Sequence, residues 1–246
     1  GADNTAVGTN ALGANTTGAQ NVAIGSSSLA ANTIGDQNVA IGQNSLDSNT
    51  EGQKNVAIGF KALCTNTTAD QVVAVGCGAL ISNTTGANNV AVGSLSLEGT
   101  TTGSDNTAAG PASGLSLTTG SNNLLLGHDA GRSNSPNTIT TGSDRIVLGN
   151  NSITNAYIRV DWTVTSDLRD KMNIEPISHG LDFVNQLNPI KFNFKKSREN
   201  ATSHGRKKYG FKAQDILALE GEDNVIIDNE DPNSLKYIGS HLVPVL

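Results

Sequence analysis

The sequence predicts a mainly β protein, in which a fibrous solenoid-like or β-roll-like repeat is followed by a small α+β domain. Two observations lead to this prediction. A 17-residue pattern recurs through the first half of the chain, and the two halves differ in composition. Residues 1–150 hold four basic residues, nine acidic residues and one aromatic residue, whereas residues 151–246 hold twelve basic residues, thirteen acidic residues and the other aromatics. Only the second half has the composition of a conventional globular domain.

The repeat opens with Asn4–Gly8, which returns 17 residues later as Asn21–Gly25 and keeps this period over eight units. Fixed self-similarity of this kind indicates a stack in which each unit buries its face against its neighbours. A leucine also returns at one fixed position of the unit, at Leu12, Leu29, Leu46, Leu63, Leu80 and Leu97. An Asn-Thr pair returns at another, beginning at Asn15, Asn32, Asn49, Asn66 and Asn83.

Within one unit, Val22 and Ile24 alternate with Ala23, which predicts a short strand with one apolar face. Glycines and the Asn-Thr pairs are expected to supply the turns and the residues that tolerate a left-handed backbone. Two interpretations of the repeated asparagines stay open: a hydrogen-bonded column, as in cross-β ladders, or turn formation alone. Because each unit has only two or three medium apolar side chains, one chain alone is expected to be marginal, and several chains around a shared axis would supply the missing burial.

The pattern changes toward residue 150. Gly114 and Gly131 take the leucine position, and the last match, Arg145–Gly149, follows after 22 residues. An atypical unit is expected where a stack ends. The two cysteines, Cys64 and Cys77, lie at different positions of the repeat, so we expect both to be free.

Composition also excludes several classes of function. The net charge of -6 without a basic stripe argues against a nucleic-acid partner, and Lys195-Lys196 and Arg206–Lys208 are interpreted as a solvated loop. No apolar run is long enough to span a membrane, and the four histidines lack metal-ligand spacing. We expect no cofactor and no metal. The chain starts at Gly1 without a methionine, which suggests a fragment of a longer protein.

The second half is expected to contain alternating strands and short helices. The predicted elements are a strand over 158–164, a helix from Pro176 to Leu187, a strand over 190–194, a charged loop to about Lys208, a strand over 209–213, a helix over 214–219, a strand over 225–227 and the start of a helix at His241. The first of these strands would place Ser166 at the end of an element.

Four blocks occur in order in this half: Ser166–Lys171, Asn173–Ile177, Leu187–Phe192 and Tyr209–Asp215. Together they resemble the self-cleaving intramolecular chaperone domain that ends phage endosialidase tailspikes and other viral fibres. The Val-Ala-Ile-Gly units are in turn similar to the coiled heads of trimeric bacterial adhesins, which have shorter coils. We therefore expect a repeat region over 1–150, a connecting strand over 151–165 that leads to a cleavage site, and a chaperone domain over 166–246 whose carboxy-terminal helix is truncated.

The resemblance implies that the bond between Thr165 and Ser166 is cut, with Ser166 as nucleophile and Lys171 as its base. Cleavage after Ser166 is the second choice. A lysine can act as a base only if burial or nearby positive charge lowers its pKa from ~10.4. A spacing of five does not bring two side chains to one face of a helix, so the segment must turn or the pair must form between chains.

Three neighbouring residues have supporting roles in this interpretation: Asp167, Arg169 and Asn173. Arg169 would lower the pKa of Lys171 or hold the oxyanion, Asn173 would be a polar helper, and Asp167 would act against the lysine unless it points elsewhere. On the local residues alone, a simpler interpretation competes, in which Ser166 caps a helix and Lys171 is a solvated charge.

The leading hypothesis is a virion tail-fibre or tailspike segment, a homotrimer assembled in the host cytoplasm, that binds upstream fibre proteins and contacts a host receptor or glycan. Its only enzymatic activity would be one self-cleavage by the serine-lysine dyad. The alternative is a host-surface adhesin in which the carboxy-terminal domain is a folding cap that is not cleaved. A glycan-degrading enzyme is disfavoured, since the repeats contain no paired carboxylates.

Overall fold

The chain forms two compact units, Gly1–Ile153 and Thr154–Leu246, which we call the solenoid and the carboxy-terminal unit. The computed structural model describes residues 1–132, 139–157, 172, 179–195, 202–221, 226–228 and 235–237. It is mainly β, as predicted. The finer boundaries expected at residues 150 and 165 stay predictions.

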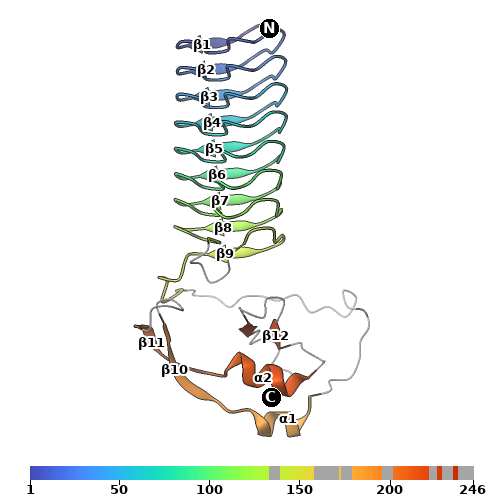
Figure 1. Cartoon of the computed structure of the whole chain (residues 1–246), viewed down its shortest axis with the longest axis vertical. Coiled ribbons are helices and arrows are strands. Elements are labelled where there is room, and N and C mark those ends of the chain that lie inside the picture. Colours follow the sequence, from blue (N-terminus) through green and yellow to red (C-terminus); the bar gives the residue numbers. More distant parts are fainter. Residues whose placement is uncertain are drawn as a thin grey trace. The chain divides into compact units, whose positions relative to one another are not determined.

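The solenoid is a stack of coils that each contribute one three-residue strand to a single parallel sheet (Figure 1). Each strand pairs in register with the next, so that Val22 lies opposite Val39 and Ala23 opposite Ala40. This confirms the stacked repeat. The strands are β1 Thr5–Val7, β2 Val22–Ile24, β3 Val39–Ile41, β4 Val56–Ile58, β5 Val73–Val75, β6 Val90–Val92, β7 Thr107–Ala109, β8 Leu124–Leu126 and β9 Ile146–Leu148.

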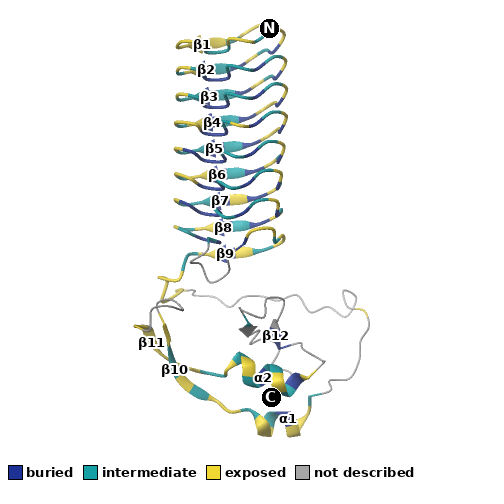
Figure 2. Ribbon diagram, viewed as in Figure 1, coloured by how far each residue is buried: buried dark blue, intermediate teal, exposed yellow. Residues whose placement is uncertain are grey.

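The inside of each coil is filled by the middle residue of the strand and by the repeated leucine. Ala57 and Leu63 of one coil are fully buried, as are the equivalent alanines and leucines of its neighbours. The flanking Val56 and Ile58 are only half-buried or exposed, and in Figure 2 the strands are drawn mostly in teal and yellow. The apolar face expected from the Val and Ile positions is therefore the outer one, because the narrow interior leaves room for alanine there.

The Asn-Thr pairs do not adopt left-handed backbone conformations, but other residues of the repeat do. The repeated leucines adopt positive φ, as at Leu63 (φ 52°), and so do the residues just before the first asparagine of each unit, such as Gln37 (φ 60°). This conformation is uncommon outside glycine and costs about 1–3 kcal/mol. It turns the chain so that the leucine enters the core, and burial of its side chain offsets the cost by about 1.5–3 kcal/mol.

The repeated asparagines form columns and also close turns. Asn49 Nδ2 donates to Asn32 Oδ1 (2.9 Å) in the preceding coil and to the carbonyl oxygen of Gly52 (3.0 Å) in its own turn. Asn49 Oδ1 accepts in turn from Asn66 Nδ2 (2.8 Å). The hydrogen-bonded column is thus confirmed, and turn formation alone is wrong, because the same side chains do both. The expectation that one chain alone is marginal counted only apolar burial, and these buried hydrogen bonds add to the stability of the single chain.

At the end of the stack, a small residue replaces a large one at one core position, and a large residue replaces a small one at another. Gly114 and Gly131 stand at the leucine position, and the middle strand residue, which is alanine in β1–β7, is Leu125 in β8 and Val147 in β9. A Cβ atom on Gly114 would lie 2.7 Å from Leu125 Cδ1 and 2.6 Å from Leu97 Cδ2, so these side chains fill the space of the missing leucine. Core volume is conserved across the change.

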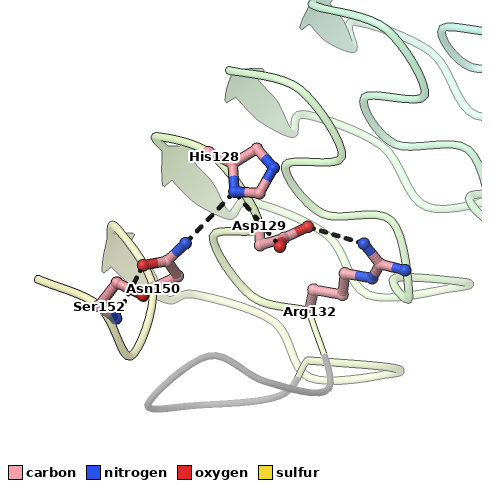
Figure 3. A network of polar contacts seen from close by, with 5 residues as sticks. All are labelled: His128, Asp129, Arg132, Asn150 and Ser152. Carbon is pink, nitrogen blue, oxygen red and sulfur yellow. Dashed lines mark hydrogen bonds and ion pairs between the residues drawn. The ribbon is translucent and has the colours of Figure 1, made fainter. Parts of the chain in front are cut away.

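A polar network joins the last two coils (Figure 3). His128 Nδ1 lies 3.3 Å from Asn150 Nδ2 and 3.3 Å from the Asp129 carboxylate, which also binds Arg132 Nη1 at 2.8 Å. The backbone N–H of Ser152 donates to Asn150 Oδ1 (2.9 Å). We interpret this network as an end closure of the solenoid, because the imidazole is largely exposed and its partners hold neighbouring turns.

The carboxy-terminal unit contains α1 Leu181–Gln186, β10 Ile190–Lys195, β11 Ser203–Gly210, α2 Ala213–Glu220, β12 Ile227–Asp228 and β13 Lys236–Tyr237. The predicted helix near 214–219 and the strand over 190–194 are confirmed. The predicted loop to Lys208 is wrong, because Ser203–Gly210 pairs antiparallel with β10. The strand expected over 209–213 likewise ends at Gly210. The elements predicted over 158–164 and from His241 lie outside the described residues.

Candidate functional site in the carboxy-terminal unit

The core of the carboxy-terminal unit is small and lies between α1, α2 and β12. Its buried apolar residues are Phe183, Ile216, Ile226 and Ile227. On α2 the spacing of four between Ile216 and Glu220 places both on one helix face, and both are buried. A carboxylate therefore shares the face that packs into the core.

Glu220 clamps the segment that follows its own helix. Its side chain is fully buried, and its Oε1 and Oε2 accept the backbone N–H groups of Ile226 (2.5 Å) and Ile227 (3.1 Å). Hydrogen bonds to an ionised acceptor contribute about 1.5–3 kcal/mol each, and buried carboxylates require such partners. Glu220 thereby fixes the start of β12 against α2.

His179 completes this buried corner. Its imidazole stacks on the ring of Phe183 with centroids 4.4 Å apart, and its Nε2 lies 4.0 Å from Glu220 Oε1. Only 8% of the His179 side chain is exposed. This histidine therefore has a structural role.

The β10–β11 hairpin carries cationic and aromatic side chains on adjacent strands. Lys191 Nζ lies 5.6 Å from the ring centroid of Tyr209, and Lys208 Nζ lies 5.4 Å from that of Phe194. The interpretation of Lys195 and Arg206–Lys208 as a solvated loop is wrong in one respect, since they belong to strands. They are nevertheless exposed.

The sequence-predicted dyad lies outside the described residues. This holds for the nucleophile, the base, the cleaved bond and all three supporting residues, namely Ser166, Lys171, Thr165, Asp167, Arg169 and Asn173. Their arrangement stays a prediction. Of the family-like residues further on, Phe211 packs against the core and Asp215 pairs with Lys212 at 3.1 Å, so both have structural roles.

Neither cysteine is in a disulfide, as predicted. Burial, helped by the nearby Asp47 carboxylate, raises the pKa of the Cys64 thiol. A raised pKa keeps Cys64 in its unreactive protonated form at neutral pH.

The described residues lack two features, a metal-ligand cluster and a membrane-spanning helix. No cluster of three or more His, Cys, Asp or Glu side chains there is placed to hold a metal ion. Nor does that part of the chain include a helix with the length and apolarity to cross a membrane.

Comparison with known proteins identifies the same segment that the sequence blocks pointed to. Residues 166–226 match the family model described as "Chaperone of endosialidase". The match covers well under half of the chain and includes α1, β10, β11, α2 and the buried Glu220 corner. Searches of the curated proteins and of the solved structures each found no match. The chain thus combines a parallel β-solenoid with a carboxy-terminal segment similar to a fibre chaperone.

Sequence reasoning missed Glu220. The available signal was its place in Ile216–Glu220, where the helical spacing puts a carboxylate on the apolar face. Its partners, the backbone N–H groups of Ile226 and Ile227, could not be read from the sequence because they depend on how the chain returns after α2.

We expect Glu220→Ala to weaken this corner selectively. Two buried N–H groups would lose their acceptors, so amide hydrogen exchange at Ile226 and Ile227 should accelerate by about 10–100-fold, which corresponds to about 1.5–3 kcal/mol. Asp182→Asn, an exposed change on α1, is the control and should leave both amides protected. Unchanged exchange in Glu220→Ala would contradict the clamp.

Proposed function

We propose that this chain is a segment of a viral tail fibre or tailspike whose carboxy-terminal domain directs assembly of three copies and then releases itself by self-cleavage. The observation that carries the proposal is the position of the family match. It begins at Ser166, the predicted nucleophile, with twelve residues between it and the end of the β-solenoid at Ile153. A fibre module is therefore followed by a chaperone-like segment at the predicted point of cleavage.

In the proposed reaction, the Ser166 hydroxyl attacks the carbonyl carbon of Thr165 while Lys171 accepts the hydroxyl proton. The C–N bond breaks, and the proton passes to the departing nitrogen, which becomes the α-amine of Ser166. This leaves an ester between the Thr165 carbonyl and the Ser166 oxygen, which one water molecule hydrolyses. A positioned base contributes ~10²–10⁴-fold, which suffices for a single turnover per chain.

Release after assembly would make the fibre kinetically stable. Once the segment that aligned the chains has left, unfolded chains can no longer be realigned, so the lifetime of the fibre depends on the barrier to unfolding. The expected setting is a virion, with assembly in the host cytoplasm and attachment to upstream fibre proteins.

The separation of assembly from cleavage is tested by Ser166→Ala in the full chain. We expect this variant to stay full length and still to reach the native mass of three copies, measured by light scattering. Lys171→Ala should behave in the same way, and Ser203→Ala, a serine outside the dyad, should be cleaved as the wild type is. A monomeric Ser166→Ala protein would show that the two roles are not separate.

A further inference from the structure

The outer side of the solenoid sheet carries valine, isoleucine or leucine over most of its length; the exceptions are Thr5 of β1 and Thr107 and Ala109 of β7. In β2–β6 the first and third residues of each strand are valine or isoleucine, and these are half-buried or exposed, while the alanine between them is buried. Exposed members include Ile24, Ile58, Val92 and Leu126. The largest contiguous apolar patch on a protein surface is often a functional interaction site.

The strands of this face are also free of charge, although beside them Lys61 Nζ lies 5.5 Å from the centroid of the Phe60 ring. None of the strands β1–β9 contains a charged residue, although residues 1–150 hold nine acidic and four basic residues and the whole chain has a net charge of -6. Copies of such a chain repel one another wherever their acidic surfaces meet. The sheet face is where two copies can approach without that cost.

The apolar face widens at its middle coils. Phe60, the one aromatic of residues 1–150, follows β4 by two residues and is 47% exposed. Leu95, three residues after β6, is 37% exposed and lies over Gly78, where a Cβ atom would come within 2.8 Å of Leu95 Cδ2. Glycine at residue 78 makes room for this leucine. Aromatic anchors near the centre of an apolar patch are typical of the residues that dominate protein interfaces.

The regular spacing of the strands on this face is the same in every copy of the chain, so two such faces can match coil by coil. Adjacent strands are ~4.8 Å apart, so the seven strands β2–β8 give columns about 30 Å long and about 10 Å wide. Their area of about 300 Å² is less than half of what one partner buries in a standard interface, ~800 Å². Copies grouped around one axis would add the flanking turns with Phe60 and Leu95, and a partner with the same coil spacing would match the columns along their full length.

We propose that the apolar stripe, which we define as the outer face of β2–β8 together with Phe60 and Leu95, is the surface on which further copies of this chain pack. The inference rests on the proposed assembly function and adds to it the location of the contact within the solenoid. The carboxy-terminal segment would bring the chains together, and the apolar stripe would hold them.

The test is the oligomeric mass of the full-length Ile58→Lys chain as a function of concentration, measured by analytical ultracentrifugation. Lysine at this exposed position keeps the coil but places a charge in the stripe. We therefore expect the protein concentration at which half of the assembly is dissociated to rise at least 100-fold. Gln71→Lys is the matched control, because Gln71 is exposed and its column already carries Lys54. Circular dichroism should show the same strand content in both variants. Val92→Lys provides a second variant if Ile58→Lys does not fold.

Cys77 gives an independent readout at the centre of the stripe. It is exposed in the single chain and lies two residues past β5, one coil after Phe60. In a Cys64→Ser background, maleimide labelling of Cys77 should slow at least tenfold in the assembled protein and return to the free rate in Ile58→Lys.

The outcomes separate this inference from the proposed function. A wild-type chain that assembles and cleaves, with Ile58→Lys assembling equally well, would overturn the apolar stripe and leave the function intact. Wild-type assembly that Ile58→Lys abolishes, without any cleavage, would support the stripe and contradict the self-processing step. A monomeric wild type would contradict both.

Discussion

Gly59→Ala is expected to destabilise the solenoid strongly. Gly59 has φ 132°, and a Cβ atom there would lie 2.6 Å from the carbonyl oxygen of Gly76 in the next coil. The backbone conformation costs a non-glycine residue about 1–3 kcal/mol, and forcing an extra carbon against packed backbone costs about 1–3 kcal/mol more. The same glycine recurs in each coil, so the strain cannot be relieved by shifting one neighbour.

The measurement is thermal and denaturant unfolding followed by circular dichroism. Gly180→Ala is the control, because a Cβ atom there would meet nothing within 4 Å and its φ is negative. We expect the denaturation midpoint of Gly59→Ala to fall clearly below that of the wild type, and that of Gly180→Ala to change little. Equal midpoints would contradict the close stacking of the glycine column.

Asn49→Ala is expected to have the second largest effect. The substitution removes a side chain that bridges Asn32, Asn66 and the carbonyl of Gly52, all buried. The carbonyl oxygen of Gly52 keeps Asn38 Nδ2 as a donor. Asn66 Nδ2 keeps the carbonyl oxygen of Ala69 as an acceptor, whereas Asn32 Oδ1 loses its donor. The three lost hydrogen bonds contribute about 0.5–1.5 kcal/mol each and the buried oxygen left without its donor costs about 1–3 kcal/mol, so the loss amounts to several kcal/mol. The neighbouring coils share the ladder, which should spread the damage to their hydrogen bonds.

Asn15→Ala is the matched control for the ladder. Asn15 occupies the same column in the first coil, but it is only half-buried, so water can satisfy the groups that it leaves. We expect its free energy of unfolding to fall by about 1 kcal/mol, against several for Asn49→Ala. If both variants lost a similar free energy of unfolding, burial of the asparagine column would not determine how much it contributes to stability.

The repeat could be predicted from the sequence because a strict period fixes which residues share a column. The position of the strands followed from Asn21–Gly25 and its copies, whereas the Asn ladder was one of two interpretations that the sequence left open. The direction in which Ala57 and Ile58 face did not follow, since period-two alternation alone does not say which face is inside. The positive φ of Leu63 was also hidden, because leucine rarely adopts it and tertiary packing overrides the local preference.

The carboxy-terminal unit was harder to predict because it lacks a repeat. The helix α2 had a clear apolar spacing, whereas the strand β11, rich in lysine and arginine, was taken for a loop on charge alone. Its pairing with β10 is set by tertiary contact and not by propensity. Glu220 was missed for the related reason that its partners lie on a later segment. The dyad of Ser166 and Lys171 stays a prediction from the sequence.

The most direct measurement is the intact mass, under denaturing conditions, of the wild-type chain beside Ser166→Ala and Lys171→Ala. We predict two fragments that meet at the bond between Thr165 and Ser166 in the wild type, and one full-length chain in each variant. A single full-length mass for all three proteins would contradict self-cleavage and would leave a solenoid adhesin with a folding cap that stays attached.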